Sequence, residues 1–237
     1  MNKLNNLNAA THQELIDQLK SIDISVPPRT EGRKTHHTEI WSITRLLATL
    51  CECQKISFPF ALSHRDKPDF LVNLEHLIIG IEVTESIPQK YAEFCALAER
   101  EFPSVPFDNG HFRWDMEVLT KNEMRAILTN PKNMSPPLSG DLAELEWAVF
   151  IKESVDGKLV KLANVGFDKF DQNWLTIYDN LPIHNINLEK AIGFLKDLLK
   201  DSWGVGWSFD AIFIERGPVI VKVTADSSEH LKLKDVW

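Results

Sequence analysis

Two acidic residues lie in apolar surroundings thirteen positions apart: Asp69 in the segment PDFLV and Glu82 in the segment IEVTE. Both segments are rich in β-branched and other apolar residues, which is typical of strands. If residues 69–74 pair with residues 77–82 in a hairpin, Asp69 stands directly opposite Glu82, and the two side chains lie about 5 Å apart. Like charges that close are destabilising, so a shared proton, a nearby cationic side chain or a divalent metal ion must compensate them.

The hydrophobic pattern of this hairpin specifies its register. One face is wholly apolar and the two carboxylates lie on the other, whereas a shift of one residue would mix the two faces. A turn at Glu75 and His76 is not of the Asn-Gly type that two-residue hairpins prefer, so a wider loop is also allowed. Any change of loop length by an even number of residues keeps the same faces. The opposed apolar pairs are Phe70–Ile81, Val72–Ile79 and Leu74–Leu77.

The paired carboxylates suit a hard cation. Mg²⁺ binds oxygen ligands, commonly takes one or two carboxylates and keeps its other positions for water and phosphate oxygens. A cation held in this way activates water and stabilises the negative charge that builds up on a phosphodiester. We therefore expect Mg²⁺ or Mn²⁺ at Asp69 and Glu82.

The elements that must position these residues follow from hydrophobic periodicity. This periodicity predicts an α/β fold with a mixed β-sheet flanked by helices. Thr35 or Thr38 is the expected cap of the second helix. Helices are expected at 12–22, 36–54, 89–102, 141–153 with an extension to Leu162, and 188–201. Strands are expected at 56–64, 69–74, 76–84, 173–180, 210–217 and 219–224.

The chain length of 237 residues suits one large domain. Residues 1–35 are expected to form an N-terminal helical arm and connector, and residues 36–237 a single α/β domain with a helical insertion at about 105–165. No apolar run approaches the roughly 20 residues of a membrane span, and the first residues lack the apolar region of a signal peptide. Three cysteines without metal-ligand spacing favour a reducing compartment. We therefore expect a cytoplasmic protein without a membrane partner.

The formal net charge of −8 counts against a protein that coats nucleic acid non-specifically, because such proteins are basic. It leaves room for a local basic groove. The stretch PPRTEGRKTHH gathers basic residues ahead of the second helix, and it is either such a groove or a solvated arm. Its basic residues are Arg29, Arg33, Lys34, His36 and His37.

The dipeptide PD, a gap of twelve residues and then EVT on an apolar strand resemble the motif of the PD-(D/E)XK nuclease superfamily. That superfamily has a helix, a three-strand meander that carries the motif, a further helix and a further strand. Residues 36–101 show the same order and residues 173–180 are a candidate for the next strand, so the resemblance covers about half of the chain. It implies a restriction-endonuclease-like core with a helical insertion, and a nuclease that hydrolyses phosphodiester bonds of DNA or RNA with Mg²⁺.

The resemblance also implies roles for individual residues. Asp69 and Glu82 would be metal ligands together with the backbone carbonyl of Val83. Glu39, on the preceding helix, matches a position where many members carry an additional acidic residue. Thr84 stands where the superfamily has a lysine that orients the attacking water and offsets negative charge, and a threonine carries no positive charge.

Two lysines are candidates for that missing charge. Lys67 falls opposite Thr84 if the hairpin register is extended, although Pro68 could bend the strand there. Lys90 lies one turn into the following helix, and migration of this lysine to a neighbouring element is known in the superfamily. If neither acts, the same fold would serve as a catalytically inactive nucleic-acid-binding or protein-assembly module. A deep apolar pocket away from Asp69 would instead indicate a small-molecule enzyme on an unrelated α/β fold.

Overall fold

The computed structural model describes residues 4, 6–114, 116–130, 134–135, 139–164, 168–204, 206 and 208–237. These residues form one eight-stranded β-sheet and six α-helices. The strands are β1 (Leu7–Ala9), β2 (Phe60–His64), β3 (Phe70–Leu74), β4 (Leu77–Ser86), β5 (Gln172–Asp179), β6 (Ala211–Arg216), β7 (Val219–Val223) and β8 (Ser228–Lys232). The α-helices are α1 (His12–Lys20), α2 (Thr35–Glu52), α3 (Gln89–Glu101), α4 (Lys121–Thr129), α5 (Leu142–Leu162) and α6 (Leu188–Leu198).

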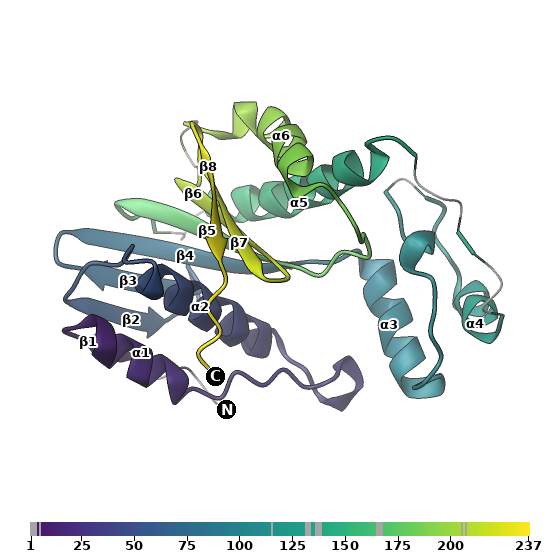
Figure 1. Ribbon diagram of the computed structural model, residues 1–237, viewed down its shortest axis with the longest axis horizontal. Helices are drawn as coiled ribbons and strands as arrows, with labels where there is room; N and C mark the ends of the chain where they lie inside the picture. The colour runs from purple at the N-terminus through teal and green to yellow at the C-terminus, as the bar shows by residue number, and fades with distance from the viewer. Residues whose placement is uncertain are drawn as a thin grey trace.

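The sheet is mixed, and its strands follow one another in chain order. Strands β1 to β4 form an antiparallel meander, β4, β5 and β6 run parallel, and β6 to β8 are again antiparallel. Helices α1 and α2 cover one face, α5 and α6 cover the other, and α3 and α4 lie beyond one end of the sheet (Figure 1). The expected α/β class with a mixed sheet flanked by helices is confirmed.

The predicted register of the β3–β4 hairpin is confirmed. Phe70 pairs with Ile81, and the pairing continues to Leu74 opposite Leu77. Strand β4 is longer than its partner, so within the described part of the chain residues 82–86 pair only with β5, on their other side. The second half of β4 therefore has a free side.

The N-cap of helix α2 lies one residue before the first of its two expected caps. Its N-cap is Lys34, in an extended conformation, rather than Thr35 or Thr38. The backbone N–H of Lys34 donates to Nδ1 of His37 at 2.9 Å, which satisfies an amide at the helix start. The expected cap Thr38 is buried within the helix instead.

Each face of the sheet has its own hydrophobic core. One core joins α1 and α2 to the first four strands, and the other joins α5 and α6 to β5, β6 and β7. A smaller cluster lies between α3 and α4. The segment expected as an N-terminal arm contributes β1 to the edge of the sheet, and Leu15 and Leu19 of α1 are completely buried. The range expected as a helical insertion contains α4 and α5, and α5 packs directly on the sheet.

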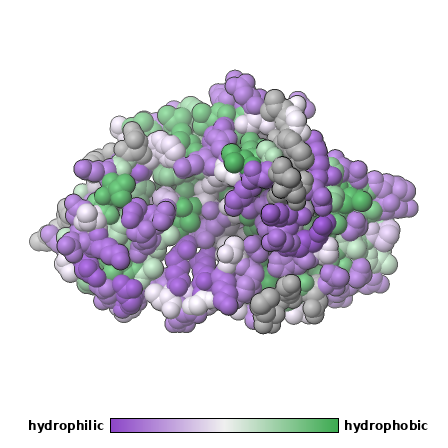
Figure 2. Space-filling view, turned by 180° about the vertical axis from the view of Figure 1, so that it is seen from behind, coloured by the Kyte–Doolittle hydropathy of each residue, from purple (hydrophilic) through white to green (hydrophobic). Residues whose placement is uncertain are grey.

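No helix in the described ranges is long and apolar enough to cross a membrane. Figure 2 shows the side of the molecule opposite to that in Figure 1, where hydrophilic residues cover most of the surface and hydrophobic residues form smaller, separate patches. Large apolar side chains are concentrated in the cores, with Trp147 and Phe70 among those that are fully buried.

Candidate functional site

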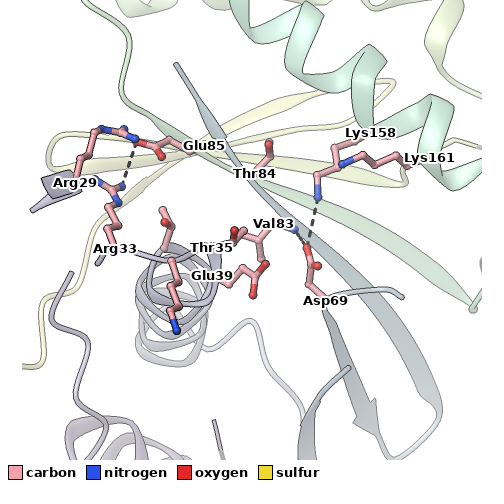
Figure 3. A pocket seen from close by; sticks show the side chains of 12 residues that line it. Arg29, Arg33, Thr35, Glu39, Asp69, Val83, Thr84, Glu85, Lys158 and Lys161 are labelled. Carbon is pink, nitrogen blue, oxygen red and sulfur yellow. Dashed lines mark hydrogen bonds and ion pairs between the residues drawn. The ribbon is translucent and has the colours of Figure 1, made fainter. Parts of the chain in front are cut away.

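A cavity of ≈ 470 Å³ lies along the free side of β4, between the start of α2 and the second half of α5 (Figure 3). It is lined by charged and polar side chains, including the carboxylates of Glu39, Asp69 and Glu85. Its basic lining residues come from the segment before α2 and from α5. They are Arg29, Arg33, Lys34, Lys158 and Lys161.

Asp69 and Glu82 are fixed side by side by the end of the hairpin. The N–H of Asp69 donates to Oε1 of Glu82 at 3.3 Å, and the N–H of Val83 donates to Oδ2 of Asp69 at 2.7 Å. The N–H and C=O of one strand residue point to the same side of the strand. The carbonyl of Val83 therefore faces the same free side of β4 as the Asp69 carboxylate.

Lys158 of α5 provides the charge that compensates this pair. Its Nζ lies 2.7 Å from Oε2 of Glu82 and 3.5 Å from Oδ2 of Asp69, and its side chain is only 12% exposed. The helix is fastened to the same strand by a hydrogen bond of 2.9 Å between the hydroxyl groups of Ser154 and Ser86. In Figure 3 the side chains of Lys158 and Lys161 extend from α5 into the cavity, and Lys158 points at Asp69.

Sequence reasoning missed Lys158, which lies 76 residues after Glu82. One weak signal was present: Ser154, Lys158 and Lys161 follow one another at spacings of four and three, which places them on one side of a helix that is otherwise rich in buried apolar residues. That stripe shows a polar helix face. It does not show which strand the face will meet.

The two lysines considered from the sequence lie outside the residues that line the cavity. Lys67 is exposed in the turn between β2 and β3, which is closed by a 2.8 Å hydrogen bond from the N–H of Arg65 to the carbonyl of Asp69. Because the β3–β4 ladder ends at Phe70, the register does not extend to Lys67. The Nζ of Lys90 is paired with Glu93 on α3 at 2.8 Å. Thr84 does line the cavity.

Glu39 joins the same electrostatic site from α2. Burial raises its pKa to about 7, with further increases from the charges of Asp69 and Glu82 and an opposing effect of Lys158. Its Oε2 also lies 3.5 Å from Nε2 of His64. Burial likewise raises the pKa of Glu82, and the adjacent Asp69 adds to that rise. The three carboxylates therefore carry more negative charge than Lys158 alone offsets, and the site favours an additional cation or proton.

The donor set fits a hard cation better than zinc. The described residues contain no group of three or more His, Cys, Asp and Glu side chains arranged to hold a metal ion. Asp69, Glu82 and the Val83 carbonyl instead offer two carboxylates and one carbonyl oxygen. Mg²⁺ is commonly held by one or two carboxylates with water in its remaining positions, whereas structural zinc needs four protein ligands.

The opposite wall of the cavity is basic. Arg29 and Arg33 both bind Oε1 of Glu85, at 2.7 Å and 3.2 Å, and Nδ2 of Asn180 donates to the same oxygen at 2.6 Å. These two arginines belong to the basic stretch identified in the sequence. They are therefore held against β4, and the solvated-arm interpretation does not describe them.

The arrangement brings together a pair of carboxylates, a partly buried lysine and a basic wall in a cavity that is open to solvent. No family model, curated protein or solved structure matches the chain. The function is therefore argued from the contacts and charges of the cavity itself.

Proposed function

We propose that the protein is a metal-dependent, nuclease-like enzyme that hydrolyses phosphodiester bonds, built on a restriction-endonuclease-like core. The observation that carries this proposal is the contact of Lys158 with both Asp69 and Glu82. A lysine beside the two carboxylates restores the positive charge that Thr84 cannot provide. The motif that resembles the PD-(D/E)XK superfamily would then have its lysine on α5 instead of β4.

Asp69, Glu82 and the carbonyl of Val83 would hold Mg²⁺ or Mn²⁺, and Glu39 would add negative charge beside the ion without binding it directly. A bound divalent cation supplies Lewis acidity and lowers the pKa of a bound water. Lys158 would orient the attacking water through its Nζ and offset negative charge on the phosphate oxygens. Its contacts with both carboxylates would hold the side chain in place before substrate arrives, which is what electrostatic catalysis requires.

The basic wall supports an anionic substrate. Arg29 and Lys161 approach the cavity from two different elements, and both line it together with the carboxylates. The overall charge of −8 is therefore no obstacle, because the cavity gathers basic residues locally. Positive groups around a cleft attract phosphate chains and position them.

One observation favours a second candidate function. Lys158 already contacts both carboxylates, and a proton on Glu39 or Glu82 could balance the remaining negative charge without a metal ion. In that case Lys158 would stand in the place of the cation, and the protein would be a catalytically inactive nucleic-acid-binding or protein-assembly module of the same fold. The two candidates differ in whether the substitutions below affect a measurable cleavage.

A nuclease assay with single-stranded DNA, duplex DNA and RNA, each with Mg²⁺ or Mn²⁺, tests the proposal. Asp69→Asn, Glu82→Gln and Lys158→Met are each expected to lower the cleavage rate by about 10²- to 10³-fold, the typical effect of removing one preorganised catalytic group. Lys90→Met is the matched control, because it removes a lysine outside the cavity, and its rate should stay within about twofold of the parent. Absence of cleavage, or cleavage that survives all three substitutions, would support the inactive module.

A further inference from the structure

Arg29 and Arg33 form a pair of basic side chains on the wall of the cavity away from Lys158 (Figure 3). Their side chains are 21% and 17% exposed, so both are held in place. Arg29 begins a 3-10 turn, Arg29–Glu31, that ends at Gly32 with a φ of 83°. This left-handed conformation, which glycine adopts without strain, turns the chain so that Arg33 returns to the same carboxylate.

The charge of this group is not balanced by its partner. Two guanidinium groups share one oxygen of Glu85, and each uses only its Nη2 in that contact. A guanidinium carries five N–H donors in a planar fork that matches the oxygens of a phosphate. With one carboxylate between two arginines, the cluster keeps a net positive charge beside a cavity that it lines.

The position of the arginine pair relative to the carboxylates follows the strand. Glu85, which holds the two arginines, lies two residues after Val83 on β4, a separation of about 6.6 Å along an extended strand. Both positions belong to the part of β4 that, among the residues the structure describes, has no strand paired on its free side. A chain of phosphates lying along this side would meet Lys158 and Asp69 at one phosphate and the arginine pair at an adjacent one.

The size of the cavity limits what can reach this wall. A volume of ≈ 470 Å³ is within the range of small-molecule sites, about 300–1,000 Å³. A duplex is much larger, since the major groove of B-DNA alone is about 12 Å wide. The floor of the cavity is therefore accessible to an unpaired strand.

We propose that Arg29 and Arg33 form a phosphate subsite for a single nucleic-acid strand, next to the phosphate that is cleaved. The inference rests on the proposed function for the choice of substrate, and it adds the substrate form and two residues that recognise it. The ligand chemistry is that of a phosphodiester chain, which DNA and RNA share. On binding, a phosphate would take over guanidinium donors from Glu85.

The test measures the anisotropy of internally labelled 12-nucleotide DNA and RNA strands in EDTA, with the full chain carrying Asp69→Asn so that nothing is cleaved. Arg29→Ala and Arg33→Ala should each weaken binding by about tenfold, as expected for a lost hydrogen bond to a charged group. Both together should reduce the slope of log K against log salt by about 1.4, which corresponds to two lost phosphate contacts on a single strand. A duplex of the same sequence should bind more weakly than the strand.

Arg125→Ala is the matched control. It removes an arginine that is also paired with a carboxylate, Glu101 at 2.9 Å, but on α3 and α4. It should leave the affinity and the salt slope unchanged. Glu85→Gln distinguishes arginines that bind phosphate from arginines that only attach the chain to β4. If they bind phosphate, removal of the competing carboxylate should retain or raise the affinity for the strand. If they only attach the chain, the variant should be less stable and its affinity unchanged.

Four results would overturn the subsite: no binding of any strand, affinities that do not depend on Arg29 and Arg33, duplex binding as tight as strand binding, or displacement of the strand by micromolar inorganic phosphate. Because the test uses neither metal nor cleavage, its failure leaves the metal site and the nuclease assay untouched. Conversely, arginine-dependent strand binding without cleavage in the parent would count against the proposed nuclease and support the subsite.

Discussion

Two carboxylates and one ammonium group share a small space between β4 and α5. Asp69 and Glu82 are held by backbone contacts on the hairpin, and Lys158 reaches both from the helix. Burial of like charges raises the pKa of Glu82, and Lys158 opposes this effect. The lysine therefore stabilises the folded protein, and in the proposed mechanism it also acts on the substrate.

Lys158→Met is expected to lower the free energy of unfolding by about 3 kcal/mol at pH 8, because loss of one partner leaves a buried charge without compensation. Millimolar Mg²⁺ should restore part of this loss, since a divalent cation then binds the carboxylates in place of the ammonium group. The measurement is urea denaturation with and without Mg²⁺. Lys161→Met removes a second lysine from the same cavity and should change stability by less than about 1 kcal/mol. A Lys158→Met protein as stable as the parent, and indifferent to Mg²⁺, would contradict this account.

At the scale of elements, the position of Asp69 depends on close packing around Gly80 of β4. Gly80 lies on the same face of β4 as Glu82, and a Cβ there would come within 2.7 Å of the Phe170 ring and 3.1 Å of Pro68. Pro68 directly precedes Asp69. The close packing of this glycine therefore supports the turn that presents the first carboxylate.

Gly80→Ala is expected to destabilise the protein by about 1–3 kcal/mol, the usual cost of overpacking, because the added methyl group must displace Phe170 or the turn. Gly193→Ala on α6 is the control, since a Cβ there meets nothing within 4 Å. It should stabilise the protein by roughly 0.5–1 kcal/mol through helix propensity. Thermal or urea denaturation of both variants checks the two opposite signs. Equal effects would show that the contact with Phe170 does not constrain β4.

The hairpin could be predicted from the sequence because its information is local. Alternation of apolar and polar residues with a period of two specifies which residues share a face, and Phe70 opposite Ile81 follows directly. The position of Lys158 is determined by contacts between segments that are far apart in the sequence. It depends on the packing of α5 against β4, and a helix pattern states only which face is polar.

Two short strands were not predicted, and helix α4 was expected only as an unplaced part of the helical insertion. Strand β1 has three residues, and β8 reads SEHLK, which lacks the apolar alternation of a strand. Both lie at the edges of the sheet, where one neighbour and a single buried side are sufficient. Helix α4 has nine residues and starts at a capping box from Thr120 to Glu123, a signal that the sequence does contain.

For the whole molecule, an ion pair links segments at opposite ends of the chain. Arg45 on α2 donates from Nε to Oε1 of Glu215 on β6 at 2.9 Å, and the two side chains are only 9% and 6% exposed. Burial raises the pKa of Glu215, and Arg45 opposes the rise without cancelling it. The pair connects the helix of the first core to a strand that contributes to both cores.

This shift makes stability depend on pH. Because the folded pKa of Glu215 lies above its ordinary value of 4.5, the folded state binds a proton more tightly than the unfolded state. The stabilisation is complete below pH 4.5 and is lost as the pH rises through the folded pKa. Relative to Glu215→Gln, the parent should therefore become progressively less stable between pH 4.5 and pH 8 in urea denaturation. A stability difference between the parent and Glu215→Gln that is the same at pH 4.5 and at pH 8 would contradict the shift.

The proposed chemistry requires Asp69 and Glu82 to hold a divalent cation. Calorimetric titration of Mn²⁺ and Mg²⁺ into the parent, Asp69→Asn and Glu82→Gln tests it most directly, with circular dichroism to verify that each variant is folded. We expect the parent and Lys90→Met to bind the metal alike, and both carboxylate variants to lose binding. Absence of binding to the parent at millimolar metal, or binding that persists unchanged in both carboxylate variants, would contradict it.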